Sequence, residues 1–185
     1  MGLDMYLSKK TYVKNWNHMS PEELHKITVK KGNKVRKDIK PERITYIVEQ
    51  VGYWRKFNAL HNWFVQNCGE GVDDCREYHV SRENLTELLD NLKKVKESLD
   101  KSTKSLAKVH VGWSNREKMY EDVEVYDNKE VVSDLLPPVE GFFFGSNVIG
   151  EWYYNEVKET IELIEELLNE DNLSSSSDFY YRASW

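Results

Sequence analysis

Hydrophobic and polar positions alternate near both ends of the chain. Leu3, Met5 and Leu7 are separated by Asp4 and Tyr6, which is the two-residue period of a half-buried β-strand. The segments 43–51 (RITYIVEQV) and 178–185 (DFYYRASW) predict two further strands, the first because it is rich in β-branched residues. Short strands of this kind indicate a small antiparallel sheet.

A different period, of three and four residues, predicts helices. Ser81 is followed by a stripe of apolar positions that predicts a long amphipathic helix over about 81–100, formed by Leu85, Leu88, Leu89, Leu92, Val95 and Leu99. The same period predicts a second long helix over about 151–169. Phe57, Leu60 and Phe64 predict a shorter aromatic helix over about 53–67, with Gly52 ending the strand before it. Ser20 and Pro21 predict a short helix that reaches about residue 26.

These elements together predict one α+β domain spanning residues 1–185, in which the small antiparallel sheet packs against the two long helices and the aromatic helix. The region 101–138 has no clear period. A serine-rich segment at 174–177 predicts a linker before the last strand.

Composition supports a folded chain. The 185 residues are 39% hydrophobic and include 6 Trp, 11 Tyr and 6 Phe, enough aromatic surface to form a core. No apolar run approaches the roughly 20 residues of a membrane helix, and the first ten residues do not resemble a signal peptide. The two cysteines form no disulfide framework. We therefore expect a cytoplasmic protein without a membrane partner.

Charge is distributed unevenly along the chain. The net charge is −6, yet residues 1–60 carry 13 Lys and Arg against 6 Asp and Glu, and the remainder carries 13 against 26. Eight basic residues fall in Lys26–Arg43, where we expect a basic loop or hairpin at about 28–42. Such a cluster could contact nucleic acid, or it could pair with the acidic remainder. Because the chain is acidic overall, a nucleic-acid partner is not expected.

The densest group of chemically versatile side chains lies in residues 53–65 (YWRKFNALHNWFV). On a helix, Trp54, Asn58 and His61 would share one face, and Lys56 and Trp63 would share the neighbouring one. An indole, an amide, an imidazole and cations suit a planar anionic ligand such as a nucleotide, with a ring stacked on the base and a cation on the phosphate. The alternative is that the aromatic residues fill the core and that His61 is a buried core histidine.

Two aromatic residues elsewhere could complete this site. Phe143 lies in the GFFFGS segment, and Tyr153 lies near the start of the second long helix. The candidate ligand-binding residues are therefore Trp54, Arg55, Lys56, Asn58, His61, Trp63, Phe143 and Tyr153.

Metal binding and catalysis have weaker support. Two histidines and two cysteines (His61, Cys68, Cys75 and His79) fall close together, but the cysteines stand seven positions apart, unlike the close pairs of structural zinc sites. We predict no metal and no cofactor. His61 together with Asp73 or Asp74 could serve a small hydrolase or nuclease, yet the chain carries no common catalytic motif. No catalytic residue is assigned.

Several segments together resemble a family of small phage- and prophage-encoded proteins: MGLDMYL, GYWRKFNALHNWFV, GFFFGS, EWYY and YYRASW. The resemblance implies expression in the cytoplasm of an infected bacterium and a task such as binding host signals or inhibiting host defence. It supplies no catalytic residues. We expect a non-catalytic accessory protein that binds a small nucleotide-like ligand, sequestering a host immune signal, with a pocket that a homo-oligomer could complete. The alternative is an inhibitor or adaptor that binds a host bacterial protein.

Overall fold

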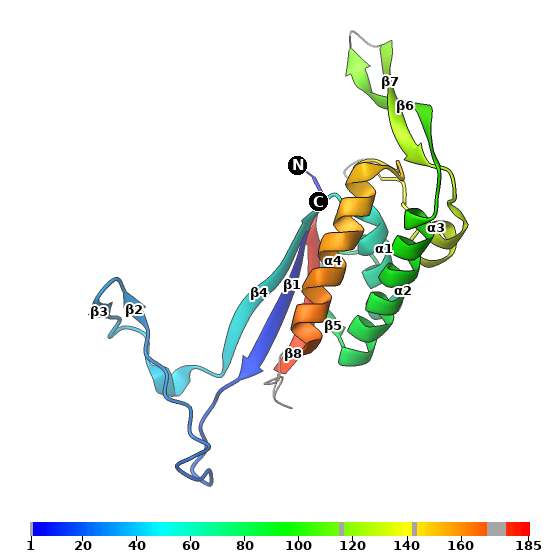
Figure 1. Cartoon of the computed structure of the whole chain (residues 1–185). Helices are drawn as coiled ribbons and strands as arrows, with labels where there is room; N and C mark the ends of the chain where they lie inside the picture. The colour runs from blue at the N-terminus through cyan, green and yellow to red at the C-terminus, as the bar shows by residue number, and fades with distance from the viewer. Residues whose placement is uncertain (1, 115–116, 142–143, 170–176) are drawn as a thin grey trace.

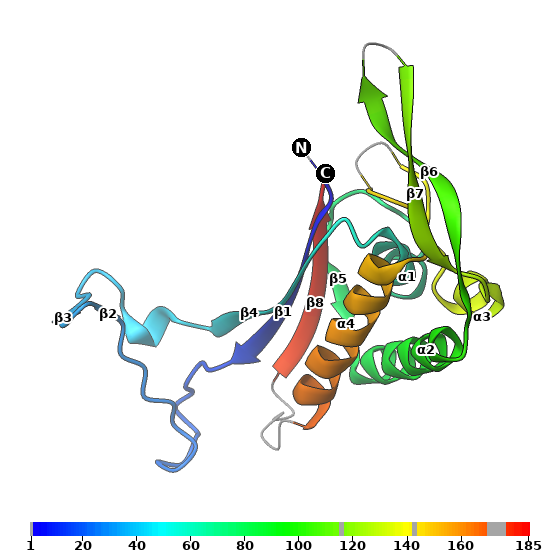
Figure 2. The same cartoon turned by 45° about the horizontal axis from the view of Figure 1, so that its top comes forward.

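The computed structural model describes residues 2–114, 117–141, 144–169 and 177–185, and it has the predicted α+β architecture. A four-stranded antiparallel sheet has the strand order β4-β1-β8-β5, formed by β4 (Tyr46–Arg55), β1 (Asp4–Tyr12), β8 (Ser177–Ser184) and β5 (Tyr78–Val80). Helices α1 (Asn58–Cys68), α2 (Arg82–Asp100) and α4 (Glu151–Asn169) cover one face of this sheet (Figures 1 and 2).

Strand alternation places the core between the sheet and the helices. The inward residues of β1 and β8 are almost fully buried, and the residues between them lie on the other face of the sheet. The predicted leucine stripe of α2 is buried against this core, and α2 packs along α4. Ser81, which the sequence places before this helix, forms a capping box with Asn84, and the two side chains fix the start of α2.

Two hairpins extend from this body. Between β1 and β4 the chain forms a long excursion that holds β2 (Lys30–Lys31), β3 (Lys34–Val35) and a 3₁₀ turn at Pro41–Arg43, and the first two pair as the predicted basic hairpin. The region 101–138, which had no clear period, forms β6 (Lys104–Ser114), β7 (Glu117–Tyr126) and the short helix α3 (Glu130–Leu135). In Figure 1 the β6–β7 hairpin projects beyond the helices.

The prediction of a helix over 53–67 is wrong at its start, because residues 53–55 belong to β4 and α1 begins at Asn58. Gly52 does not end the strand. Leu7 of β1 faces Gly52 and Ser8 faces Gln50, so Val51 is an extra, bulged residue and β4 continues to Arg55. A Cβ at position 52 would lie 2.7 Å from the Trp54 ring, so glycine makes room for that indole.

Two smaller predictions also need correction. No helix forms at 21–26, where Glu23 accepts a hydrogen bond from the backbone N–H of Ser20 and closes a turn instead. Residues 174–176 of the predicted serine-rich linker lie outside the described residues. Ser177 is not linker but the first residue of β8, and its hydroxyl lies 3.0 Å from that of Thr11 on β1.

Candidate functional site

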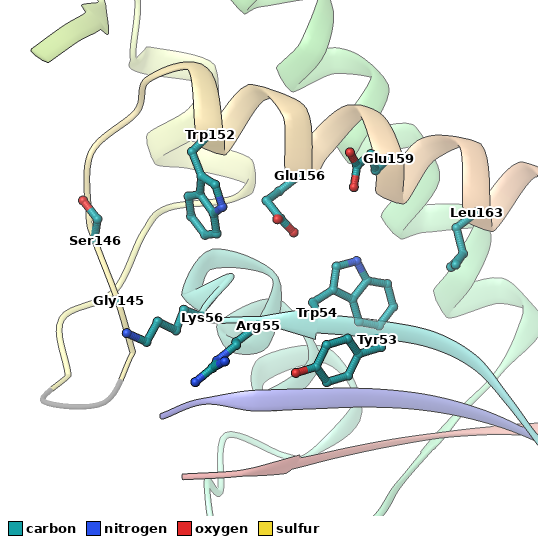
Figure 3. Close-up of a pocket in the computed structure, with 10 residues that line it drawn as sticks. All are labelled: Tyr53, Trp54, Arg55, Lys56, Gly145, Ser146, Trp152, Glu156, Glu159 and Leu163. Atoms are coloured by element: carbon teal, nitrogen blue, oxygen red, sulfur yellow. The ribbon is translucent and has the colours of Figure 1, made fainter. Parts of the chain in front are cut away.

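A cavity of about 660 Å³ lies between β4 and the side of α4, within the roughly 300–1,000 Å³ range of small-molecule sites (Figure 3). We call it the β4–α4 pocket. Its lining comes from three segments that are far apart in the sequence: Tyr53, Trp54, Arg55 and Lys56 from β4 and the residue after it, Gly145 and Ser146 from the loop before α4, and Trp152, Glu156, Glu159 and Leu163 from α4.

One wall is a single stripe of α4. Trp152, Glu156, Glu159 and Leu163 follow one another at the four- and three-residue steps that align side chains on a helix. The indole of Trp152 is 43% exposed and is held by an edge-on contact with Phe57, with ring centres 6.0 Å apart. Figure 3 shows the side chains of Trp152 and Glu156 directed from α4 toward β4. An accessible but positioned indole offers a planar ligand a stacking surface.

The floor of the pocket is Trp54, which is buried. Its indole N–H donates a hydrogen bond of 2.9 Å to the hydroxyl of Thr160 on α4, and that hydroxyl donates to the carbonyl of Glu156 one turn earlier. Because strand residues alternate between faces, Trp54 points toward α4 whereas Tyr53 and Arg55 lie on the other side of β4 (Figure 3). The floor and the α4 wall are thus joined by a buried hydrogen bond.

The basic end of the pocket is formed where β4 turns into α1. Lys56 has a φ of 63°, and Gly145, with a φ of 93°, packs directly against it. A Cβ at position 145 would lie 2.8 Å from the Cβ of Lys56, so the loop can approach this closely only with glycine there. Within the described residues Lys56 makes no ion pair, and Arg55 at the rim has only a 3.8 Å approach to Asp4.

The α4 wall of the pocket carries two acidic side chains, Glu156 and Glu159, away from the basic end. Half-burial, and secondarily the charge of Glu159, raise the pKa of the Glu156 carboxyl to about 7. Neither glutamate lies within 4 Å of a basic side chain in the part of the chain that the structure describes. The pocket therefore offers carboxylates on one side of the indole and an ammonium group on the other.

The eight candidate ligand-binding residues lie in different places in the structure. Trp54, Arg55 and Lys56 line the β4–α4 pocket, whereas Phe143 lies outside the described residues. Trp63 is buried in the core against Phe64. Tyr153 is buried too, and its hydroxyl donates a 2.7 Å hydrogen bond to the carbonyl of Leu136.

Asn58 is a buried anchor for the loop that ends at the pocket. Its side-chain N–H groups lie 3.2 and 3.1 Å from the carbonyls of Phe144 and Ser146, and its side-chain oxygen accepts from the backbone N–H of Val139. A buried amide with these partners holds both ends of the loop to the start of α1. Asn58 therefore positions Gly145 and Ser146 rather than reaching the pocket itself.

His61 is also buried, in a cluster that does not line the β4–α4 pocket. Its Nδ1 lies 2.8 Å from the hydroxyl of Tyr181 and its Nε2 lies 3.1 Å from a carboxylate oxygen of Asp73. The rings of Phe144 and Trp185 pack against the imidazole. The structure thus brings together the His61 and Asp73 pair considered for catalysis. Both ring nitrogens already have partners, which is the arrangement of a buried core histidine.

Asp74 and the two cysteines do not join this cluster as ligands. Asp74 lies beside Arg76, and burial raises the pKa of the Cys68 thiol to about 12. Among the described residues, no group of three or more His, Cys, Asp and Glu side chains is arranged to hold a metal ion.

Sequence reasoning missed Trp152, Glu156 and Glu159 as pocket residues. The period that predicts this helix places Trp152 on its apolar side. The spacing that aligns Trp152 and Leu163 with two acids between them was present in the sequence, but it borders the core stripe of Tyr153, Val157 and Thr160. Only the position of β4 shows that this second stripe faces another element.

In the described parts of the chain no helix is long and apolar enough to span a membrane. Comparisons of the chain with protein-family models, with curated proteins and with solved structures gave no match.

Proposed function

We propose that this chain is a non-catalytic binding protein for a small planar anionic ligand of the nucleotide class, which it holds in the β4–α4 pocket. The observation that carries the proposal is the order of groups along the pocket: Lys56 beside Gly145 at one end, then the accessible indole of Trp152, then Glu156 and Glu159 further along α4 (Figure 3). A nucleotide has the same three parts in the same order: a phosphate, a planar ring and an edge with N–H donors.

Each part of such a ligand has a complementary group. The base stacks on Trp152, a contact worth about 1–3 kcal/mol per base. The phosphate meets Lys56, with Arg55 at the rim as a second cation. The N–H groups of the base donate to Glu156 and Glu159, which have no basic partner among the described residues.

The carboxyl groups of Glu156 and Glu159 favour ligands that carry N–H donors. A purely anionic molecule would be repelled by Glu156 and Glu159, whereas an amino-bearing base would not. Guanine presents two adjacent N–H donors that match one carboxylate, and uracil presents only one. Purine nucleotides with an exocyclic amino group should therefore bind better than uridine nucleotides. Given the resemblance to phage-encoded proteins, the biological effect would be sequestration of a host nucleotide signal.

A thermal-shift panel tests this proposal. GMP, AMP, UMP, ADP-ribose and cyclic dinucleotides are added separately, and a bound ligand should raise the melting temperature because a hundredfold excess over its Kd stabilises the folded state by about 2.7 kcal/mol. Trp152→Ala should abolish the shift. Trp16→Ala is the matched control, because Trp16 is similarly exposed, at 47%, but lies outside the pocket. A panel in which no compound shifts the wild type would overturn the proposal.

A further inference from the structure

No helix of the described residues covers the face of the sheet opposite α1, α2 and α4. This face presents aromatic and cationic side chains. In Figures 1 and 2 all the helices lie on one side of the sheet. The uncovered side carries Tyr6, Tyr53 and Tyr180 together with Arg55 and Arg182, and we call it the open sheet face. Its residues occur on three adjacent strands, so they form one continuous surface.

Strand register sets these side chains beside one another. Tyr6 on β1 lies directly opposite Tyr53 on β4 and Arg182 on β8, and the two tyrosine rings are 5.4 Å apart. One step along, Ser8 faces Tyr180, and Lys10 lies 4.0 Å from the centre of the Tyr180 ring. Rings and cations therefore lie side by side across the sheet, as cross-strand neighbours do.

The acidic groups on this face are already engaged. Asp4 accepts a 2.6 Å hydrogen bond from the hydroxyl of Tyr53, Asp178 lies 3.5 Å from His79, and Glu77 pairs with Lys10. Arg182 is exposed and makes no ion pair among the described residues. The carboxylates thus reduce the positive charge of Lys10 but leave Arg182 exposed and Arg55 with only its 3.8 Å approach to Asp4.

The basic excursion between β1 and β4 leaves the body on the side of the open sheet face. Figure 2 shows it extending away from the helices, and a backbone hydrogen bond from Val13 to Thr45 closes its base. We call residues 14–44 the basic arm. The eight basic residues of Lys26–Arg43 are all exposed, against only Asp38 and Glu42. The net charge of −6 describes the whole chain, whereas this side of the molecule is positive and α4, on the helix side, carries six glutamates against one lysine.

We propose that the open sheet face and the basic arm bind single-stranded nucleic acid. Tyr53 is exposed and Tyr6 and Tyr180 are partly exposed. Tyrosines on an uncovered sheet face stack on bases only where the faces of those bases are free, which excludes an intact duplex. The lysines of the arm neutralise the phosphate backbone beyond the sheet and release counterions. Binding through the tyrosines should depend little on the nucleotide sequence, because every base has a face that can stack on a ring.

Fluorescence anisotropy with fluorescein-labelled dT20 and U20, and with a 20-base-pair duplex as competitor, tests this proposal. The wild type should bind both single strands at 50 mM salt, and the affinity should fall steeply by 200 mM. Tyr180→Ala should weaken binding about tenfold, whereas Tyr180→Phe retains the ring and should bind normally. Arg182→Glu, which changes an exposed side chain and does not disturb the core, should weaken binding as well.

Matched variants distinguish the contribution of the basic arm to strand binding from that of the open sheet face. A triple variant with Lys30, Lys31 and Lys34 changed to Glu should reduce both the affinity and its salt dependence, whereas Lys94→Glu on α2 should not. Tyr120→Ala, on the β6–β7 hairpin, controls for loss of an exposed tyrosine. Trp152→Ala should leave strand binding unchanged, so failure of the nucleotide pocket and failure of this surface are distinguishable.

Three results would overturn the proposal. The first is no anisotropy change with either single strand at 50 mM salt. The second is equal loss of binding in Tyr180→Ala and Tyr120→Ala. The third is equal affinity for duplex and single strands that depends only on the lysines of the arm, which would show unspecific attraction to charge without base stacking.

Discussion

The indole N–H of Trp54 donates a 2.9 Å hydrogen bond to the hydroxyl of Thr160, and this bond joins β4 to α4 beneath the β4–α4 pocket. Thr160 is fully buried and Trp54 nearly so, and Gly52 leaves the space into which the indole fits. The two walls of the pocket are therefore fixed relative to one another by a polar contact inside the core. A site held in this way needs little rearrangement to bind a rigid planar ligand.

Thr160→Val should destabilise the fold, because the nearly isosteric substitution leaves the buried N–H of Trp54 without an acceptor. The expected loss in the free energy of unfolding is about 2 kcal/mol, the cost of an unsatisfied buried donor. Urea unfolding followed by circular dichroism measures it. Thr160→Ser keeps the hydroxyl and should lose less than Thr160→Val. Equal stability of Thr160→Val and the wild type would show that the bond contributes nothing.

Asn58→Ala should release the loop that carries Gly145 and Ser146. The substitution removes the donors that satisfy two backbone carbonyls and the acceptor for the Val139 N–H, so stability should fall by about 2–3 kcal/mol. Amide hydrogen exchange at Phe144 should accelerate more than exchange in α2. Asn67→Ala is the matched control on the same helix, since its side-chain N–H donates to the carbonyl of Trp63 within α1. Unchanged exchange at Phe144 would contradict the anchoring role.

Glu156 should make stability depend on pH. Its pKa is about 7 in the folded chain against an ordinary value of 4.5, so between these values the folded chain holds a proton that the unfolded chain has released. The free energy of unfolding therefore falls as pH rises from 4.5 to 7.

Glu156→Gln should remove that fall and stabilise the protein at pH 8 by about 1 kcal/mol, a value reduced for solvent screening of a half-exposed group. Unfolding measured at pH 4.5, 6 and 8 tests this expectation. The control is Glu166→Gln, an exposed position on the same helix, which should leave the profile unchanged. Parallel profiles for Glu156→Gln and the wild type would contradict the assignment.

His61 and Tyr181 should be energetically coupled, because their 2.8 Å hydrogen bond is buried. In a double-mutant cycle of His61→Phe and Tyr181→Phe, the coupling energy should be about 1 kcal/mol. His18→Phe, at an exposed position in the basic arm, should be additive with Tyr181→Phe. If the two substitutions are additive, the hydrogen bond between His61 and Tyr181 does not contribute to stability, which would contradict this prediction.

The sequence predicted the elements whose side-chain period agrees with their environment. The predicted elements β1, α2, α4 and β8 each have one buried and one exposed face. Apolar residues therefore recur at a fixed period, as in Leu3 to Leu7 or in the stripe from Leu85 to Leu99. The boundary at 53–58 was not predicted. Trp54 and Asn58 satisfy a helical spacing, but residues 53–55 gain more from pairing with β1 than from extending α1.

The candidate site was only partly predictable for the same reason. Trp54, Arg55 and Lys56 were identified from their chemistry, yet their partners on α4 are about a hundred positions away, and no local period records a contact of that kind. Asn58 and His61 are polar and chemically versatile, which made them candidates. The structure shows instead that each satisfies buried groups, a role that polar core residues share with ligand contacts.

The central claim, that the β4–α4 pocket binds a nucleotide, is tested most directly by the indole N–H resonances in a ¹⁵N–¹H correlation spectrum. The six tryptophans give six such signals, and Trp152→Ala and Trp16→Ala assign two of them. During titration with GMP the Trp152 signal should move saturably while the Trp16 signal stays in place. A titration that leaves the Trp152 signal unmoved, or that moves Trp16 alone, would contradict the claim.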